Sequence, residues 1–346
     1  MPTTYAIPDG RTVMAATLYT GTGAAASISN AVNGVSFQPD WVWIKSRSNA
    51  LNSGLMDSVR GATKLLISNA TNAEQTLTDE LTSFNTNGFS LGVSSNGYTN
   101  YSSYTYVGWQ WKAGGTAVSN TAGSITSSVS ANTTAGFSVV TYTGTGSAAT
   151  VGHGLGVAPS MMIVKRRDAV AQWNVYHASI GATGRLYLNA TDATNTSTAP
   201  WNDTTPTSTV FTVGTATDTN TSASTIVAYC FAPVAGYSAF GSYTGNGSAD
   251  GPFLYFGFRP RWIMYKRTDS TGQWNILDTS RSPINAANIL LRANLSNADE
   301  TNVVYDQDFL SNGWKIRSTN VDINVSAATY IYAAFAENPF KYANAR

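Results

Sequence analysis

Short apolar runs alternate with clusters of Gly, Asn, Pro and Ser along the whole chain. The runs are rich in β-branched and aromatic residues, as at 137–142, 209–213 and 330–335. Such runs between turn-forming clusters predict β-strands. Only residues 72–83 have an apolar spacing that also fits a helix of one or two turns. The pattern as a whole predicts an all-β protein built as β-sandwiches with jelly-roll or Greek-key connections.

One phrase occurs three times in the sequence. Leu-Tyr-Thr-Gly-Thr-Gly at 18–23 returns in closely similar form at 141–146 and 242–247. The tyrosines of the three copies lie 123 and 101 residues apart (142 − 19 and 243 − 142). Solenoid repeats are ~20–50 residues long, whereas a spacing of about 100 residues is typical of an independently folded domain. The sequence therefore predicts three tandem β-sandwich modules.

Further landmarks follow each copy in the same order. A proline stands six residues before a lysine, Gln-Trp-Asn follows in copies two and three, and each copy closes on an aromatic strand. Copy one has residues 52–56 where the others have Gln-Trp-Asn, so copies two and three form the closer pair. The landmarks are Pro39 and Lys45, Pro159 and Lys165, Pro260 and Lys266, then 172–174 and 273–275, and the closing strands 105–111, 226–231 and 330–335.

The landmarks also set the predicted boundaries. An N-terminal arm and module 1 take residues 1–113, module 2 takes 136–236, and module 3 takes 237–346. Residues 114–135 are rich in Ser, Thr and Gly without apolar periodicity, which indicates a linker. Modules 2 and 3 have almost no spacer between them, so we expect their mutual orientation to be fixed.

Composition narrows the class of function. Only 11% of the residues are charged, against about 25% in a typical soluble domain, so Ser, Thr, Asn and Gly must form most of the surface. Twenty basic and nineteen acidic residues leave a net charge of +1, which argues against nucleic acid or anionic lipid as partners. Neither a signal peptide nor an apolar run of membrane-helix length is evident. We expect no membrane insertion and no cofactor, and we expect the single cysteine, Cys230, to be buried as a small apolar residue.

Four phrases stand out once the repeats are aligned. They are the Tyr-Thr-Gly-x-Gly turn, Val-Gly-His-Gly-Leu-Gly-Val-Ala-Pro at 151–159, Gly-Asn-Gly-Ser-Ala-Asp-Gly-Pro-Phe at 245–253, and the ending Pro-Phe-Lys-Tyr-Ala-Asn-Ala-Arg at 339–346. In this combination the chain, over nearly its whole length, resembles an uncharacterised β-rich repeat of virion structural proteins from tailed bacteriophages, particularly marine phages and cyanophages. Members of that family are usually called tail fibre or tail-associated proteins. The resemblance implies a virion protein assembled in the host cytoplasm and brings no catalytic residues.

The chain offers little for catalysis or metal binding. His177 corresponds to Asp57 and Asp278 in the other copies, and a site that changes residue type between copies is a poor catalytic apparatus. We expect His177 to be a strand-end residue that hydrogen-bonds a loop, and we predict that the protein is not an enzyme. One cysteine and two histidines exclude a zinc site for practical purposes. An acidic cluster at 299–308 allows a calcium site as an alternative to a solvated loop, and we favour the loop.

Two residue sets invite an interaction. The lysines Lys45, Lys165 and Lys266 end otherwise apolar strands, and we expect them to extend along the sheet towards solvent; a contact with an acid of a neighbouring module is the alternative. Amide-flanked tryptophans supply a flat apolar face beside hydrogen-bonding groups, which is what a sugar ring requires. Core packing is the commoner fate of such a tryptophan. The candidate glycan-stacking residues are Trp173, Trp274, Gln172 and Gln273.

These observations predict a non-enzymatic phage virion protein. We expect a tail fibre or tail-associated protein that contacts host-surface glycan, with a capsid decoration or head-fibre protein as the alternative. Repeated weak sites gain avidity through effective concentration. A polysaccharide-degrading tailspike is disfavoured, because the sequence shows no paired-carboxylate cleft. We expect other virion proteins as partners and a homo-oligomer, with a trimer favoured, formed through residues 1–16 and 114–135 by strand addition.

Overall fold

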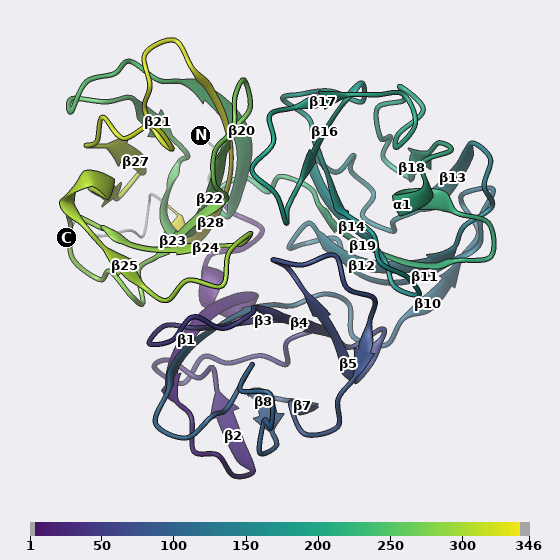
Figure 1. Ribbon diagram of the computed structural model, residues 1–346, viewed down its shortest axis with the longest axis horizontal. Helices are drawn as coiled ribbons and strands as arrows, with labels where there is room; N and C mark the ends of the chain where they lie inside the picture. The colour runs from purple at the N-terminus through teal and green to yellow at the C-terminus, as the bar shows by residue number, and fades with distance from the viewer. Residues whose placement is uncertain (1–3, 340–346) are drawn as a thin grey trace.

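The protein is built from antiparallel β-sheets grouped in three lobes around a common centre (Figure 1), so the all-β prediction is confirmed. The structure is a computed structural model and describes residues 4–339. Each lobe, called a module here, pairs one large sheet with one small sheet. The large sheets face the centre and the small sheets lie on the outside.

Module 1 places its closing strand second in the large sheet, between its first strand and the proline-to-lysine strand. The large sheet has the order β1 (Met14–Thr20), β9 (Thr105–Trp111), β3 (Trp41–Ser46), β4 (Gly54–Asp57), β5 (Gly61–Ile67) and β6 (Gln75–Thr76), and the small sheet has the order β2 (Ala26–Ser29), β8 (Gly88–Leu91) and β7 (Leu81–Asn85).

Modules 2 and 3 repeat this order, and module 2 adds two strands at its edge. The large sheet of module 2 runs β10 (Val118–Asn120), β11 (Ser127–Asn132), β12 (Phe137–Thr143), β19 (Thr225–Phe231), β14 (Met161–Arg166), β15 (Trp173–His177), β16 (Gly184–Tyr187) and β17 (Asn195–Thr196), beside β13 (Ala149–Gly152) and β18 (Val210–Val213). That of module 3 runs β20 (Ser238–Thr244), β28 (Thr329–Pro339), β22 (Phe258–Arg267), β23 (Asn275–Asp278), β24 (Ile289–Arg292) and β25 (Glu300–Thr301), beside β21 (Phe253–Tyr255), β27 (Gly313–Ile316) and β26 (Gln307–Leu310).

Three segments differ from their predictions. Residues 72–83 contain β6 and the start of β7 and no helix; the short helical turns of the described chain are η1 (Gly10–Thr12), α1 (Thr217–Asn220) and η2 (Val303–Tyr305). The predicted linker, 114–135, forms β10 and β11 and pairs with β12. The N-terminal arm also has a place in the fold, since Ile7 is buried and Met14 begins β1; Met1–Thr3 lie outside the described residues.

The apolar strands of the large sheets are buried on both faces. Side chains alternate across a strand, so successive residues of β3 face opposite layers. Val42 and Ile44 pack inside module 1, whereas Trp41 and Trp43 face the centre of the molecule. This double burial explains why the run from proline to lysine has no polar alternation.

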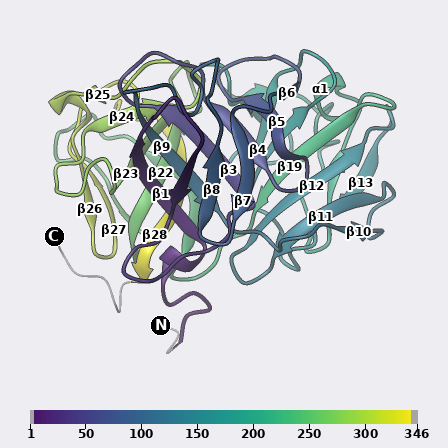
Figure 2. The same ribbon diagram turned by 90° about the horizontal axis from the view of Figure 1, so that it is seen from below.

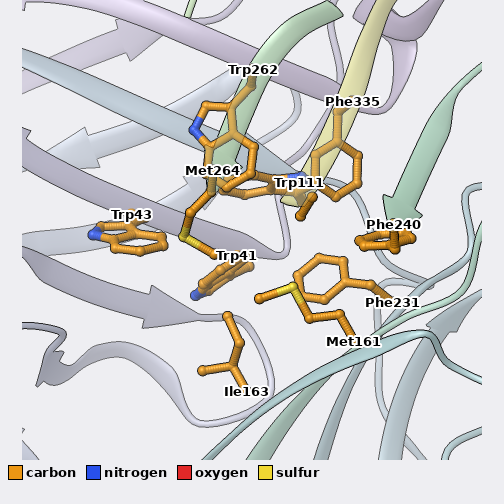
Figure 3. A pocket seen from close by; sticks show the side chains of 11 residues that line it. Trp41, Trp43, Trp111, Met161, Ile163, Phe231, Phe240, Trp262, Met264 and Phe335 are labelled. Carbon is orange, nitrogen blue, oxygen red and sulfur yellow. The ribbon is translucent and has the colours of Figure 1, made fainter. Parts of the chain in front are cut away.

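An apolar core fills the centre where the three large sheets meet (Figure 3). Trp41 stacks on Tyr229 of module 2 with ring centroids 4.5 Å apart, and Trp111 meets Trp262 of module 3 edge to face at 5.4 Å. Phe231 and Phe335 join modules 2 and 3 at 5.7 Å. The remaining cavity is only about 10 Å³. The centre is therefore a shared hydrophobic core with no room for an organic ligand.

The Tyr-Thr-Gly turn has the same construction in each module. In module 3 the Tyr243 hydroxyl donates to the Ile323 carbonyl oxygen over 2.8 Å, and a Cβ on Gly245 would lie 2.2 Å from the Val325 oxygen, which explains the glycine. A buried asparagine closes each turn by accepting a backbone N–H, 2.8 Å away in all three copies. These asparagines are Asn100, Asn220 and Asn324.

Candidate functional site

The two candidate glycan-stacking tryptophans lie in the interfaces between modules. Trp173 and Trp274 are 0% and 1% exposed. The indole Nε1–H of Trp173 donates to the carbonyl oxygen of Ile67 in module 1 over 2.8 Å, and that of Trp274 donates to Tyr187 in module 2 over 2.8 Å. Neither ring presents a face to solvent, so the prediction of stacking platforms is wrong and the residues hold modules together.

The glutamines beside them have a local structural role. Gln172 accepts a hydrogen bond from the side chain of Asn189, and Gln273 accepts one from Asn294 over 2.6 Å. The same asparagines accept the backbone N–H of each tryptophan. Module 1 repeats the arrangement with Asn52, Asn69 and, in place of the tryptophan, Ser53. The amides therefore fix the start of β15 and β23.

The three lysines form a cyclic set of links between modules. Lys45 donates to Leu295 O of module 3 over 2.7 Å, Lys165 to Thr71 O of module 1 over 3.3 Å, and Lys266 to Thr191 O of module 2 over 3.1 Å. All three side chains are buried, so the prediction that they extend towards solvent is wrong, and the acceptor is a carbonyl rather than an acid. Burial lowers the pKa of Lys45 to about 7 and those of Lys165 and Lys266 to about 8.

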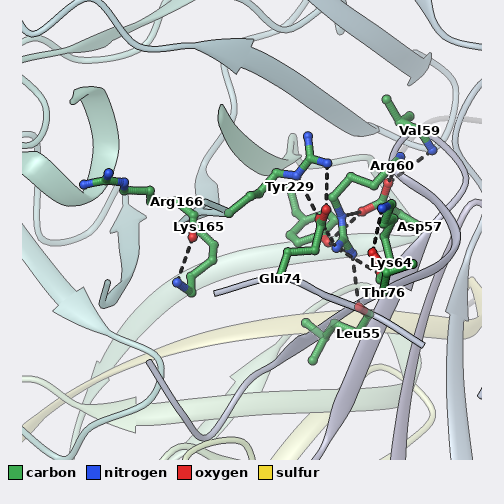
Figure 4. A network of polar contacts seen from close by, with 11 residues as sticks. Leu55, Asp57, Val59, Arg60, Lys64, Glu74, Thr76, Lys165, Arg166 and Tyr229 are labelled. Atoms are coloured by element: carbon green, nitrogen blue, oxygen red, sulfur yellow. Dashed lines mark hydrogen bonds and ion pairs between the residues drawn. The ribbon is translucent and has the colours of Figure 1, made fainter. Parts of the chain in front are cut away.

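A buried ionic network lies in the first interface, between modules 1 and 2 (Figure 4). Arg60 pairs with Asp57, and its Nη1 lies 2.9 Å from Glu74, which also binds Arg167 of module 2 at 2.8 Å. The Tyr229 hydroxyl of module 2 donates to Asp57 over 2.8 Å and accepts from Arg60 over 3.0 Å. Burial alone lowers the pKa of Arg60, but the negative partners outweigh it and raise that pKa above its ordinary value. The network ties the two modules through groups that are costly to separate.

The third interface, between modules 3 and 1, repeats this network. Arg281 pairs with Asp278 at 2.6 Å and with Asp299 at 3.2 Å, and Asp299 binds Arg47 of module 1 at 2.8 Å. Trp109 of module 1 donates its Nε1–H to Asp278 over 3.0 Å, in the place that Tyr229 has in the first interface. The sequence carries a signal for both networks in the motif Asp-x-x-Arg, which is present at 57–60 and 278–281.

The second interface, between modules 2 and 3, lacks these charges. Ile180, Thr194 and Thr268 stand where the first interface has Arg60, Glu74 and Arg167. His177 replaces the aspartate; its Nε2 lies 3.2 Å from Tyr332 O of module 3, and its Nδ1 accepts the Ser179 N–H over 3.2 Å. Burial lowers the pKa of His177 to about 4. His177 is thus a neutral residue that bonds Ser179 in the turn after its own strand, as expected, and also bonds strand β28 of the neighbouring module, which was not expected.

The acidic cluster at 299–308 is divided among basic and amide partners. Asp299 binds two arginines, Glu300 binds Arg292 at 2.6 Å, and Asp308 binds Arg317 at 2.6 Å. Asp306 accepts from Asn288 over 3.0 Å. Across residues 4–339, no group of three or more His, Cys, Asp or Glu side chains is placed to hold a metal ion.

Two further sequence features can be placed. Cys230 is buried, as predicted, and burial raises the pKa of its thiol to about 12. His153 is buried beside the glycine-rich turn, with Nε2 3.1 Å from Thr207 O. In the described part of the chain no helix is both long enough and apolar enough to cross a membrane.

Hydroxyl-lined grooves are the candidate contact surface. One groove of about 460 Å³ lies over the second interface, where Ser179 and Thr194 of module 2 face Ser242, Thr244 and Thr268 of module 3. Another, of about 370 Å³, lies at the corresponding place in module 2 and includes Arg167. The first groove has no charged lining residue, so it suits an uncharged, hydrogen-bonding partner.

Comparison with known proteins identifies the family of the chain but finds no relative of known activity. The chain belongs to the family described as a domain of unknown function, DUF7483, whose model matches residues 9–339. No curated protein matches the chain. No solved structure matches it either.

Proposed function

We propose that this member of the DUF7483 family is a non-enzymatic structural protein of a tailed-phage virion, acting as a tail fibre or tail-associated protein that contacts host-surface glycan. The proposal rests on the repeat phrases that resemble such virion proteins. One structural observation supports it: three modules close into a single body whose interfaces use the buried polar side chains, while hydroxyl-lined grooves remain outside.

We assign glycan contact to these grooves, because Trp173 and Trp274 are buried. Hydroxyl and backbone groups form hydrogen bonds with neutral sugars but supply little stacking, so each site is weak. Several weak sites on one particle still give avidity. This explains how a chain without an exposed aromatic platform at the predicted positions serves in attachment.

A capsid decoration or head-fibre protein is the second candidate. The observation that favours it is the compact three-lobed shape, with η1 and the end of β28 together at one end of the molecule (Figure 2). A Cβ on Gly10 would lie 2.2 Å from Ala336 O, which shows how closely these segments pack. A compact body of this kind is better suited than an extended fibre to binding the surface of a capsid.

The virion role is tested by location and adsorption. Gold-labelled antibody against the chain should mark phage particles, on the tail for the first candidate and on the head for the second. The purified chain should bind host cells, and periodate treatment of the cells should abolish binding. Particles that lack the chain would refute the proposal. Binding that survives periodate would refute the glycan part alone.

Oligomerisation and catalysis are tested separately. The homo-oligomer, with a trimer favoured, predicts a mass near three times 36.6 kDa in light scattering, and a monomer at high concentration contradicts it. The non-enzymatic role predicts no depolymerisation of host polysaccharide. Depolymerisation that His177→Ala removes would contradict it.

A further inference from the structure

The three modules differ at the outer edge of their first large-sheet strand. In module 2 this strand, β12, is covered by β11, which pairs with it from Ser128↔Thr141 to Asn132↔Phe137. In modules 1 and 3 the equivalent strands, β1 and β20, are the end strands of their sheets within residues 4–339. Module 2 therefore shows, within the same molecule, how a strand is added to this edge.

The uncovered edge of β20 is accessible along its middle. Ala239, Phe240 and Gly241 are half-buried, whereas their counterparts on β12, residues 138–140, are fully buried beneath β11. The Ala336 N–H bonds Tyr237 O and the Gly245 N–H bonds Ala328 O, so odd-numbered residues of β20 face β28. In an antiparallel ladder the alternate residues face the other way, so the backbone groups of Phe240 and Ser242 point to the open edge.

The edge of β1 is less open than that of β20. The Ser280 hydroxyl of module 3 donates to Ala16 O of β1 over 2.7 Å. Ser280 belongs to the segment from Asp278 to Arg292, which spans 14 residue steps (292 − 278). The equivalent segment of module 2, from His177 to Tyr187, spans only 10 (187 − 177).

Space for a further strand beside β20 follows from the repeat. Residues 177–187 of module 2 contribute Ser179 and Ile180 to the groove beside β20. They are as long as their counterparts 57–67 in module 1, since both segments span ten steps (67 − 57 and 187 − 177). The two grooves share their positions: Thr141, Thr143 and Thr225 in one are Ser242, Thr244 and Thr329 in the other. In module 2 the wall of the groove is β11 itself, through Ser127 and Ser128. At β20 no strand takes the place of β11, and the far side of the groove is formed by Ser179, Ile180 and Thr194 of module 2.

We propose that β20 binds an extended, uncharged segment of a partner protein by antiparallel strand addition, in the manner of β11 on β12. Backbone hydrogen bonds supply the affinity and alternate side chains supply the specificity in this mode of recognition. The groove favours small hydroxyl or methyl side chains, as β11 has, and its lack of charge disfavours a charged segment.

The test uses a peptide with the sequence of residues 126–133, Thr-Ser-Ser-Val-Ser-Ala-Asn-Thr, as a probe for the full chain. Fluorescence anisotropy should show saturable binding, and hydrogen exchange of the Phe240 and Ser242 amides should slow when the peptide is bound. Replacing Ser242 with proline removes one outward N–H, and should raise the Kd about tenfold or more. A peptide with proline in place of Ser130 should bind as weakly.

Leu18→Pro is the matched control, because Leu18 has the same position on β1. It should leave peptide binding unchanged and reports what proline does to the fold at an edge strand. Equal binding by Ser242→Pro and the unaltered chain would overturn the proposal, as would no binding by the unaltered chain. A concentration-dependent dimer that Ser242→Pro abolishes would assign the edge to a second copy and overturn the proposal of a different partner.

Discussion

Acid should weaken the fold through His177. Its imidazole is buried between modules 2 and 3, with both nitrogens bonded as a neutral ring: Nε2–H towards Tyr332 O and Nδ1 accepting the Ser179 N–H. Protonation would place an N–H against the Ser179 N–H and a charge in the interface. Burial disfavours the charged ring and lowers its pKa from 6.5 to about 4.

The sign and size of the effect follow from this shift. Between pH 6.5 and about 4 the unfolded chain binds a proton at this residue and the folded chain does not, so stability falls as the pH falls. At about 1.4 kcal/mol for each tenfold change in the ionisation constant, the loss is roughly 3 kcal/mol by pH 4 and roughly 2 kcal/mol by pH 5. For a protein with a net stability of about 5–15 kcal/mol this is a large fraction.

The assay compares urea unfolding of the wild type and His177→Gln from about pH 7 to about pH 4.5. The variant keeps a neutral polar group, so it should lose roughly 2 kcal/mol less than the wild type between pH 7 and pH 5. Carboxylates such as Glu74, which also lose stabilising charge in acid, act equally in both proteins and cancel. His153→Gln is a control within module 2 and should reduce the pH dependence independently. Parallel curves for the wild type and His177→Gln would refute the reasoning.

Three further changes test the interfaces, each by urea denaturation. Arg60→Met should lower the free energy of unfolding by about 3–5 kcal/mol, because it leaves buried carboxylates unpaired. The control Arg166→Met removes a partly exposed ion pair with Asp168 and should lower it by at most about 1 kcal/mol. Equal losses would contradict the role of the network. Trp274→Ser, which copies Ser53 of module 1, should cost about 3–5 kcal/mol, and a neutral effect would contradict its place in the interface. Burial lowers the pKa of Lys165 to about 8, so this residue should raise the free energy of unfolding by up to about 3 kcal/mol as the pH rises from 8 to 10.5. Lys45 and Lys266 have lowered pKa values too, so Lys165→Met should reduce the total rise by up to about 3 kcal/mol without abolishing it, and a rise equal to that of the wild type would contradict the assignment.

The strands could be predicted from the sequence because β-branched and aromatic runs between turn residues determine them locally. The sequence also contains a signal for the central core. A strand such as Trp41-Val42-Trp43-Ile44, apolar at every position, requires burial on both faces, and a lone two-sheet sandwich buries only one. The meeting of three large sheets follows from that requirement.

The interfaces could not be predicted in the same way, because the residues that form them resemble a surface site. Trp173 between amides matches the composition of a sugar-stacking site, and only the folded structure, in which the ring is buried and bonded to Ile67 of module 1, shows otherwise. Residues 114–135 were predicted as a linker, and the two strands in them were missed for a related reason. Val118 in β10 is exposed and β11 alternates small residues, so the backbone pairing of this edge hairpin leaves no apolar period in the sequence.

Carrying three modules on one polypeptide frees each interface to diverge. In a trimer of identical subunits every substitution appears three times, so an ion pair is kept or lost at all contacts together. Here the Arg60 and Arg281 networks persist while the contact between modules 2 and 3 has His177 and two threonines. A body of this kind placed on a threefold axis could bind in three non-equivalent orientations, and its open β20 edge would face a different neighbour in each.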